Sequence, residues 1–378
     1  MAFLGYSIFM TTWWILLVIY LLIKTRQIKS LSEQPITNDK PALAIIIAVR
    51  NEEEDLEKAL HSVCNINYQN YRIIVVNDRS TDCTAEILEE FASRYPQLII
   101  TTITTLPNGW LGKNNALYQG YLSSTEEWLL FTDADVEFHP DAVSKALNYS
   151  VKNKLDHLCV LPHVVSRSQA LNSMLGTFTL MMMLQFRPWD VSNPKSRAFI
   201  GIGAFNLINR DAYEKIGTHK AIRLRPDDDL KLGYTVKKHG LRSDALSGEH
   251  YICLEWYKSI SQFINGLMKN AFAVTDYNIT RVIVGMIITF LLFGLPVPLM
   301  LICGNLTIRL MAAVIILFQM IYMLNPALPN KWWHALTIPF ATTLVVYIIV
   351  RATWLTLKQG GIYWRDTFYS LAMLKGES

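Results

Sequence analysis

An uncharged apolar run near the N-terminus sets the first constraint on this chain. Residues Leu4 to Ile23 are long enough to cross the hydrocarbon core of a bilayer as one helix. No small-residue cleavage site follows, so we expect a retained anchor rather than a signal peptide. Lys24, Arg26 and Lys29 follow the run, whereas no charged side chain precedes it. The positive-inside rule then places the N-terminus outside and the following residues in the cytosol.

The composition indicates that the chain joins two kinds of segment. Of its 378 residues, 51% are hydrophobic and 17% are charged, which is too apolar for a purely soluble enzyme and too charged for a pure membrane bundle. The net charge of +4 gives no argument for nucleic acid as a partner. The five cysteines are scattered, odd in number and without C-x-x-C spacing, which indicates reduced thiols rather than a disulfide framework or zinc site.

Alternating strands and helices after residue 41 predict an α/β fold with a doubly wound, mostly parallel sheet. Residues 42–49 form a continuous apolar run, the pattern of a central strand covered on both faces. Helices are predicted between this strand and two further strands over residues 71–76 and 98–103. Residues 30–40 are polar and predict a linker. Ligands of such sheets bind beyond the carboxyl ends of the strands, where Asn51, Asp78 and Asp133 would gather.

Two carboxylates follow a short buried strand predicted over residues 128–131. Asp133 and Asp135 are two residues apart, so on a continuing strand they would share a face. Two convergent carboxylates at a strand end suit a hard divalent cation that also holds substrate phosphates. An acidic turn at a strand end is the alternative, because a lone Asp-x-Asp is common by chance.

Two glycine-containing stretches lack the signatures of phosphate-binding loops. Residues 105–120 do not have the P-loop spacing, and Lys113 near a predicted helix start either faces an anion or is a solvated lysine in a turn. Residues 201–206 resemble a dinucleotide-binding loop, but a strand-like stretch follows instead of a helix. We therefore expect these glycines to permit a close backbone approach to a ligand or a tight turn.

Three successive carboxylates, Asp227 to Asp229, open a predicted helix that ends in Lys237 and Lys238. Complementarity to the helix dipole alone would favour this pattern, as it would for Glu52 in the acidic start of an earlier helix. Three adjacent negative charges still repel one another unless a cation or a function offsets the repulsion. One of them is a candidate general base for deprotonating a hydroxyl group.

Beyond residue 257 the chain becomes apolar again. Residues 260–268 have the spacing of an interfacial helix, and residues 282–303, 306–324 and 335–357 are three span-length segments. If all three span, the basic tail lies outside, against the charge rule. If residues 282–303 are re-entrant or interfacial, Arg309 and the tail both lie inside, which we favour. Residues 172–186 are either a core helix or a helix on the membrane surface.

In their order along the chain, these motifs resemble those of a membrane-anchored family 2 glycosyltransferase with a GT-A catalytic domain. Residues 109–116 with Gln119-Gly120 resemble the W-x-GK-x-x-A-x-x-QG stretch of one subgroup, which contains the diaponeurosporenoate and hopene-associated glycosyltransferases. Ceramide glucosyltransferases are more distant relatives of this subgroup. Residues 217–220 and 363–365 fit this subgroup too. The Q-x-x-R-W motif is absent, which argues for a single transfer. The four family motifs are residues 50–53, 77–82, 133–135 and 228–229.

The resemblance implies inverting, metal-dependent transfer of one sugar from a nucleotide sugar, such as a UDP-sugar, to a hydroxyl or carboxyl of a lipid or isoprenoid-like acceptor. Asp229 is preferred as the base because counting back from Leu232 and Gly240 places it at the second acid of the family pair. A polysaccharide synthase or polyprenyl-phosphate sugar transferase, and a non-catalytic membrane accessory protein, are the alternatives. The resemblance implies that the catalytic residues are Asp229 and Asp228 and that Mg²⁺ or Mn²⁺ is bound by Asp135 and Asp133. The residues implied to bind the nucleotide sugar are Asn51, Glu52, Asp78, Lys113 and Asp133.

The same reasoning predicts how the chain is divided and where it resides. We expect an integral protein of the cell membrane with its catalytic domain in the cytosol. The predicted parts are an anchor over residues 1–29, a GT-A domain over 41–257, an interfacial helix over 258–280, transmembrane segments over 281–357 and a cytosolic tail over 358–378.

Overall fold

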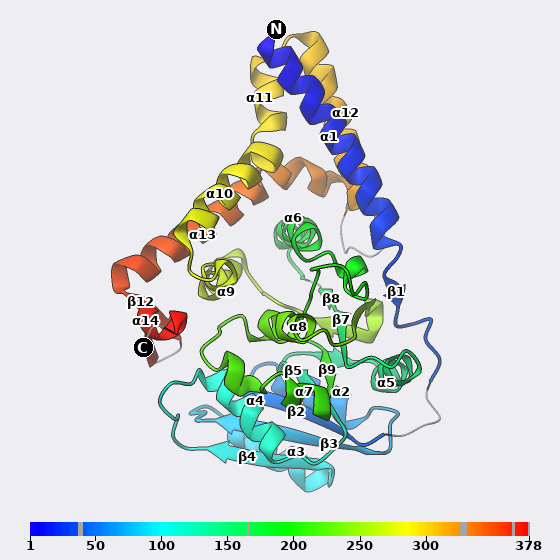
Figure 1. The fold of residues 1–378 in the computed structure, drawn as a ribbon, viewed down its shortest axis with the longest axis vertical. Helices are drawn as coiled ribbons and strands as arrows, with labels where there is room; N and C mark the ends of the chain where they lie inside the picture. Colours follow the sequence, from blue (N-terminus) through cyan, green and yellow to red (C-terminus); the bar gives the residue numbers. More distant parts are fainter. Residues whose placement is uncertain (37–40, 165, 326–330, 365–366, 377–378) are drawn as a thin grey trace. The chain divides into compact units, whose positions relative to one another are not determined.

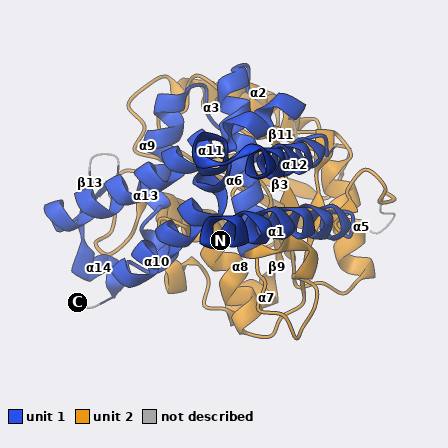
Figure 2. Cartoon of the chain, turned by 90° about the horizontal axis from the view of Figure 1, so that it is seen from above, with its two compact units in different colours: residues 1–27, 165–185, 256–378 blue, residues 28–164, 186–255 orange. Residues whose placement is uncertain are grey.

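The computed structural model describes residues 1–36, 41–164, 166–325, 331–364 and 367–376. The end of the predicted linker, residues 37–40, and Arg365 of the tail motif lie outside the described residues. The chain divides into two compact units, which Figure 2 distinguishes by colour. Unit 1 comprises residues 1–27, 165–185 and 256–378, and unit 2 comprises residues 28–164 and 186–255.

An eight-stranded sheet forms the centre of unit 2 (Figure 1). The strand order is β1-β10-β7-β9-β5-β2-β3-β4. Every pair is parallel except those that β9 makes with β5 and β7. The predicted mostly parallel α/β sheet is therefore confirmed. The strands are β1 (Lys29–Ser30), β2 (Leu43–Val49), β3 (Tyr71–Asp78), β4 (Leu98–Ile103), β5 (Trp128–Thr132), β7 (His157–Leu161), β9 (Asn206–Asn209) and β10 (Ser243–Ser247).

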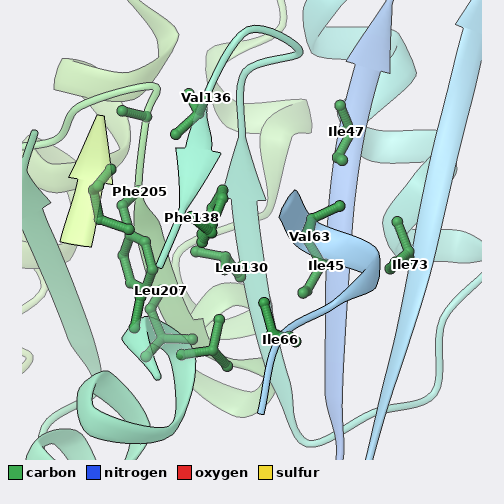
Figure 3. Close-up of a cluster of buried hydrophobic side chains, with 14 of the residues drawn as sticks. Ile45, Ile47, Val63, Ile66, Ile73, Leu130, Val136, Phe138, Phe205 and Leu207 are labelled. Carbon is green, nitrogen blue, oxygen red and sulfur yellow. The ribbon is translucent and has the colours of Figure 1, made fainter. Parts of the chain in front are cut away.

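Both faces of the sheet are covered because side chains alternate along each strand. On one face Ile45 and Ile47 join a core with α2 (Leu56–Cys64), α3 (Thr84–Arg94) and α5 (Ala142–Lys152), part of which Figure 3 shows. On the other face Ile46 packs with α4 (Gly112–Leu122), α7 (Arg210–Lys215) and α8 (Asp228–Lys238). Each fully buried isoleucine contributes about 1.5–3 kcal/mol relative to an exposed one.

The first part of the predicted linker is docked onto unit 2. Lys29 and Ser30 form β1 and pair with β10, and Leu31 is fully buried. The Lys145 ammonium donates hydrogen bonds to the backbone carbonyls of Ser32 and Gln34 at 2.7 and 2.5 Å. A small second sheet, of order β6-β11-β8, completes unit 2; its strands are β6 (Glu137–Phe138), β8 (His163–Val164) and β11 (Ile252–Leu254).

Unit 1 consists mainly of apolar helices. Among the described residues, three helices are long and apolar enough to cross a membrane: Ala2–Thr25, Leu306–Met323 and Trp332–Gln359. Residues 260–294 form a pair of helices bent by 115°. A hairpin of β12 (Gly361–Trp364) and β13 (Thr367–Ser370) lies in the sequence between α13 and α14. The helices of this unit are α1 (Ala2–Thr25), α6 (Gln169–Phe186), α9 (Ile260–Asn270), α10 (Ile279–Thr289), α11 (Pro296–Cys303), α12 (Leu306–Met323), α13 (Ile338–Gln359) and α14 (Leu371–Lys375). The last residue of α6, Phe186, belongs to unit 2.

Helices α1 and α12 lie side by side and run in the same direction (Figure 1). Asn325, just after α12, donates a hydrogen bond from Nδ2 to Oγ1 of Thr25 at 3.3 Å, which joins the carboxyl ends of the two helices. Arg309 therefore lies at the same end of the pair as Met1. The favoured alternative, which placed Arg309 on the side of Lys24, is wrong, because two parallel neighbours keep their amino ends together.

Candidate active site

The loops after β2 and β3 are tied together through Asn51 and Glu52, which the sequence assigned to the nucleotide-sugar site. Asn51 Oδ1 accepts a hydrogen bond from the Thr81 backbone N–H at 2.8 Å, and the Asn51 N–H donates to Ser80 Oγ at 3.1 Å. The backbone N–H of Glu52 donates to Thr84 Oγ1 at 3.0 Å. Asn51 adopts a positive φ of 54°, so it is held in a conformation that asparagine tolerates better than most residues. Both residues thus shape the edge of the sheet where Asp78 ends β3.

Asp78 is buried and engages the guanidinium of its own neighbour. Arg79 donates from Nε to Oδ1 at 2.8 Å and from Nη2 to Oδ2 at 3.0 Å. Only 4% of Asp78 is exposed. A Cβ on Gly112 would collide with Asp78 Oδ2, so the glycine at the start of α4 is what allows this helix to approach the carboxylate. Asp78 is therefore a rigid acceptor whose charge is already balanced.

Lys113, the next residue of α4, reaches two of the predicted acids. Its ammonium lies 2.7 Å from Asp133 Oδ1 and 3.7 Å from Asp228 Oδ2. Burial lowers the pKa of Lys113, but the charges of Asp133, Asp228 and Asp229 outweigh that effect and raise the pKa above its usual value. Lys113 is therefore a permanent cation facing carboxylates, and the alternative of a solvated lysine in a turn is wrong.

Asp133 and Asp135 do not lie on a continuing strand. Strand β5 ends at Thr132, and residues 133–136 form a turn before β6, so the prediction that the two carboxylates share a strand face is wrong. They still influence each other: burial and the neighbouring charges of Asp133 and Glu52 raise the pKa of Asp135 to about 7. The turn thus gathers carboxylates without the geometry of a pleated strand.

The three acids at the start of α8 lie in three different environments. Asp227 forms a two-pronged ion pair with Arg225, with both contacts at 2.8 Å. Asp228 is 5% exposed and faces Lys113. Asp229 accepts a hydrogen bond on Oδ2 from the Gly203 N–H at 2.9 Å and on Oδ1 from the Leu230 N–H at 2.7 Å. Of these three acids, Asp228 and Asp229 therefore lie on the side of Lys113 and Asp133.

Burial raises the pKa of both carboxyl groups in this pair, so each is a stronger base than an exposed aspartate. It raises the pKa of Asp228 to about 7, with Lys113 opposing the shift and Asp229 adding to it. Burial and the charge of Asp133 likewise raise the pKa of Asp229, against the lowering effect of Lys113. A carboxylate with a raised pKa near neutrality is suited to accept a proton at physiological pH.

The glycines of residues 201–206 bring the acids together. A Cβ on Gly203 would collide with Asp133 Oδ2, and a Cβ on Gly201 would collide with the backbone carbonyl of Asp229. The Asp133 N–H also donates to the Gly203 carbonyl at 3.0 Å. The glycines thus permit a close backbone approach to two carboxylate-bearing segments of the chain itself, whereas the predicted approach to a ligand stays a prediction.

The donor set fits a divalent cation shared with a substrate. Among the described residues no group of three or more His, Cys, Asp or Glu side chains converges as a complete metal site. Asp133 and Asp135 nevertheless lie close enough to raise a carboxyl pKa, and the Glu52 charge adds to the excess. Mg²⁺ and related hard cations are typically bound by one or two carboxylates together with phosphate oxygens and water. Two carboxylates with unbalanced charge match that requirement.

A small pocket next to the acids contains residues that the sequence did not assign to the site. Asn206 and His219 line it together with Thr132, and neither follows a strand end in a way that a local pattern would reveal. His219 lies in the motif of residues 217–220, which was the only available signal for it. The full lining is Lys113, Leu117, Phe131, Thr132, Asp133, Gly203, Asn206, His219, Asp228, Asp229 and Leu232.

Comparison with known proteins shows what this chain is similar to. Residues 44–217 match the family model for glycosyl transferase family 2. The 4,4'-diaponeurosporenoate glycosyltransferase of Staphylococcus aureus (strain USA300) is 28% identical over 221 residues, which cover 57% of each chain. The protein of the same name from strain MRSA252 matches over the same shares. The match thus spans little more than half the length of these relatives.

One solved structure resembles nearly the whole chain. It is the mannosyltransferase PcManGT from Pyrobaculum calidifontis in complex with GDP-Man and Mn²⁺. The TM-score is 0.59 at 15% sequence identity, and the alignment covers 93% of this chain and 98% of the other. At this identity the likeness demonstrates a shared fold, and the roles of individual residues have to come from the geometry described above.

Proposed function

This chain carries a family 2 glycosyltransferase domain with the GT-A fold, and from that premise we propose that it transfers one sugar from a UDP-sugar to a lipid or isoprenoid-like acceptor. The transfer is to a hydroxyl or carboxyl group, inverting and non-processive. The observation that carries the proposal is the cluster of Asp133, Asp135, Asp228 and Asp229 around a single lysine.

Asp78 and its surroundings are suited to hold the nucleotide. A buried carboxylate with fixed oxygens accepts hydrogen bonds from a base or ribose in one orientation, while the paired Arg79 removes the cost of its unbalanced charge. Asn51 and Glu52 hold the adjoining loops in place. Lys113, which directly follows Gly112, adds a permanent positive charge for the phosphates.

Asp133 and Asp135 would hold Mg²⁺ or Mn²⁺ against the diphosphate. A bound cation supplies Lewis-acid stabilisation of the negative charge that develops on the departing diphosphate. Of the two residues, Asp135 carries the raised pKa and Asp133 the ion pair with Lys113. We therefore assign Asp135 mainly to the metal and Asp133 to both the metal and the nucleotide sugar.

Asp229 is suited to act as the general base. Two backbone N–H groups fix its two oxygens, which leaves lone pairs free to accept a proton from the acceptor hydroxyl in one orientation. Its raised pKa strengthens it as a base. Asp228 faces Lys113 and would hold its ammonium in position for the phosphates of the donor. With a carboxyl acceptor, which is already ionised, no proton would have to be removed and no base would be required.

A membrane-embedded acceptor is supported by the helices of unit 1. The three span-length helices indicate membrane association, and by the charge rule the basic residues after α1 favour a cytosolic position for the catalytic domain. The curated relatives are named for 4,4'-diaponeurosporenoate as a substrate. The missing Q-x-x-R-W motif supports a single transfer rather than chain extension. We therefore propose the cell membrane as the location of the protein.

A donor and acceptor screen tests the proposal. The purified full chain is incubated with Mn²⁺, membrane lipid extract and a panel of UDP- and GDP-sugars, and the lipids are analysed for a sugar-sized mass shift. We expect one nucleotide sugar to give a lipid carrying a single sugar, and no product with Asp229→Asn. A polymeric product would instead identify a synthase. No product combined with no metal-dependent binding of any nucleotide would identify a non-catalytic protein.

A further inference from the structure

A line of buried polar side chains crosses the otherwise apolar face of the sheet that carries α4 and α8. Ser243 on β10, His157 on β7 and Asn206 on β9 are exposed by 4%, 0% and 2%. His157 Nδ1 lies 2.9 Å from Ser243 Oγ, and His157 Nε2 lies 3.0 Å from Asn206 Oδ1. Buried polar networks are costly unless every member has a partner, so this line requires a reason beyond packing.

The proton positions along this line follow from the charge state of the histidine. Burial lowers the pKa of His157 to about 4, so near pH 7 the ring is neutral and carries one N–H. If Nε2–H donates to Asn206 Oδ1, then Ser243 donates to Nδ1, and the amide group of Asn206 presents its N–H donors to the pocket. The flipped amide would aim an oxygen at a pocket lined by three carboxylates and one lysine, where the excess of negative charge makes that orientation unfavourable.

His219 provides a second neutral donor to the same pocket. Tyr213 Oη accepts a hydrogen bond from the His219 backbone N–H at 2.9 Å and lies 2.5 Å from His219 Nδ1. The tyrosine hydroxyl then donates to Nδ1, which leaves the single ring proton on Nε2. Burial lowers the pKa of His219 to about 3, and Lys113 adds to this shift, so the ring stays neutral beside the acids.

The pocket between these donors and the acids has room for about one water molecule. The rest of its lining comes from Lys113, Gly203 and the apolar side chains of Leu117, Phe131 and Leu232. The Thr132 hydroxyl also lines the pocket and already donates to the Ala204 carbonyl at 2.8 Å. A group that fills this space can accept hydrogen bonds from Asn206 and His219 and donate one to a carboxylate. A hydroxyl group has these properties and this size.

We propose that Asn206 and His219 form a subsite that binds one hydroxyl group of the donor's sugar, with His157 as the positioning residue that orients the Asn206 amide. This inference rests on the proposed function, because it places the sugar beside Asp133 and Asp229. It assigns sugar recognition to neutral donors on β9 and residues 217–220, apart from the nucleotide and metal ligands. Sites that hydrogen-bond a substrate hydroxyl discriminate strongly against ligands that leave their polar groups unpaired.

The test measures the contribution of the sugar to binding. Affinities for UDP-glucose, UDP-galactose and UDP are determined with Mn²⁺ by calorimetry, with GDP-mannose and GDP in parallel. For the tightest nucleotide sugar, Asn206→Ala is expected to weaken binding about tenfold while the affinity for the free nucleotide changes less than about twofold. Asn206→Asp, which replaces donors by a further negative charge, is expected to weaken it more.

Variants at His157 separate positioning from folding. His157→Gln keeps an N–H donor for Asn206 and is expected to retain affinity for the nucleotide sugar within about threefold, whereas His157→Leu is expected to resemble Asn206→Ala. Asn209→Ala, on the same strand, is the matched control and is expected to leave the sugar contribution unchanged, because Asn209 caps α7 by accepting from the Asp211 N–H.

Two outcomes would overturn the inference while leaving the proposed function intact. One is an unchanged affinity difference between nucleotide sugar and nucleotide in folded Asn206→Ala. The other is an equal loss of affinity for both ligands, which would show a general structural effect. If the wild-type chain binds no nucleotide with Mn²⁺, the proposed function falls and this inference falls with it.

Discussion

The two acidic regions at the carboxyl edge of the sheet differ in how their charge is balanced. At the end of β3, Asp78 is neutralised by two hydrogen bonds from Arg79. Beyond β5 and at the start of α8, Asp133, Asp228 and Asp229 share the single ammonium of Lys113. The charge of the first region is balanced by the protein alone, whereas the second region has an excess of negative charge.

Under the proposed function, this difference separates the region that would bind a cation and carry the reaction from the region that would bind the nucleotide. A balanced, buried carboxylate serves as a fixed acceptor and needs nothing from the ligand except hydrogen-bond donors. An unbalanced cluster keeps carboxyl pKa values raised, to about 7 for Asp135 and Asp228, and a divalent cation or a proton from the acceptor relieves it. Substitutions in the two regions should therefore separate binding from turnover.

The largest expected contrast comes from removing one charge in each region. Asp229→Asn should lower kcat about 10³-fold or more, because an amide cannot accept the proton, while Mn²⁺-dependent UDP binding changes little. Asp78→Asn should instead weaken UDP binding with a small effect on kcat. The measurements are steady-state transfer of labelled sugar and calorimetry with UDP.

Asp227→Asn is the matched control for the first variant. It breaks the buried ion pair with Arg225 and should lower the melting temperature, yet it leaves the pocket acids in place, so kcat of the folded protein should change by less than about tenfold. Normal turnover in Asp229→Asn would remove Asp229 from its role as base.

Metal removal should give the next largest effect, confined to the unbalanced region. Chelation with EDTA is expected to weaken UDP binding about 100-fold, and restoring Mn²⁺ or Mg²⁺ should recover it. Mn²⁺ alone should also raise the melting temperature of the wild-type chain by relieving repulsion around Asp135, and Asp135→Asn should abolish this increase. Metal-independent UDP binding of full strength would contradict the assignment of Asp133 and Asp135.

The parts of the molecule that local patterns encode were predictable from the sequence. Continuous apolar runs identified β2, β3 and β5, and the acids directly after them were identified because parallel strands end at one edge. The Lys113 position followed from a loop before a helix start. These features depend on residues that are close together in the chain, so periodicity and punctuation reveal them.

The remaining parts depend on contacts between distant residues. Lys29 and Ser30 form a strand only because β10, more than 200 residues later, offers a free edge. Strand β9 enters antiparallel between β5 and β7, and this insertion is what places Asn206 against His157 and beside α8. The three neighbouring acids Asp227–Asp229 look alike in the sequence, and only Arg225, Lys113 and Gly203 make them different.

The pH dependence should sharpen the same comparison. Because Asp229 must be ionised to accept a proton, and burial raises its pKa, kcat/KM should fall about tenfold for each pH unit below that raised pKa and level off above it. The effect on stability has the opposite sign: a carboxyl pKa raised by folding makes the metal-free melting temperature fall as the pH rises from about 4 to 7. A flat rate profile down to pH 5 would contradict raised pKa values in the cluster.

The smallest and most specific effects should come from alanine substitutions at two glycines, each of which lies against an aspartate of one region. Gly112→Ala places a methyl group against Asp78 Oδ2 and should weaken UDP binding about fivefold, with kcat at saturating donor unchanged. Gly203→Ala places one against Asp133 Oδ2 and should instead raise the Mn²⁺ concentration needed for half-maximal rate.

Gly109→Ala is the control for both glycine substitutions. Gly109 lies in the loop before α4 with a positive φ of 79°, and no atoms lie within 4 Å of the added methyl group. The substitution should therefore cost some stability without changing the affinity for UDP or for Mn²⁺. If Gly112→Ala altered the metal requirement as strongly as Gly203→Ala, the two regions would be coupled through α4, because Lys113 directly follows Gly112 and contacts Asp133. The division between a balanced nucleotide end and an unbalanced metal end would then have to be abandoned in favour of one continuous charge network.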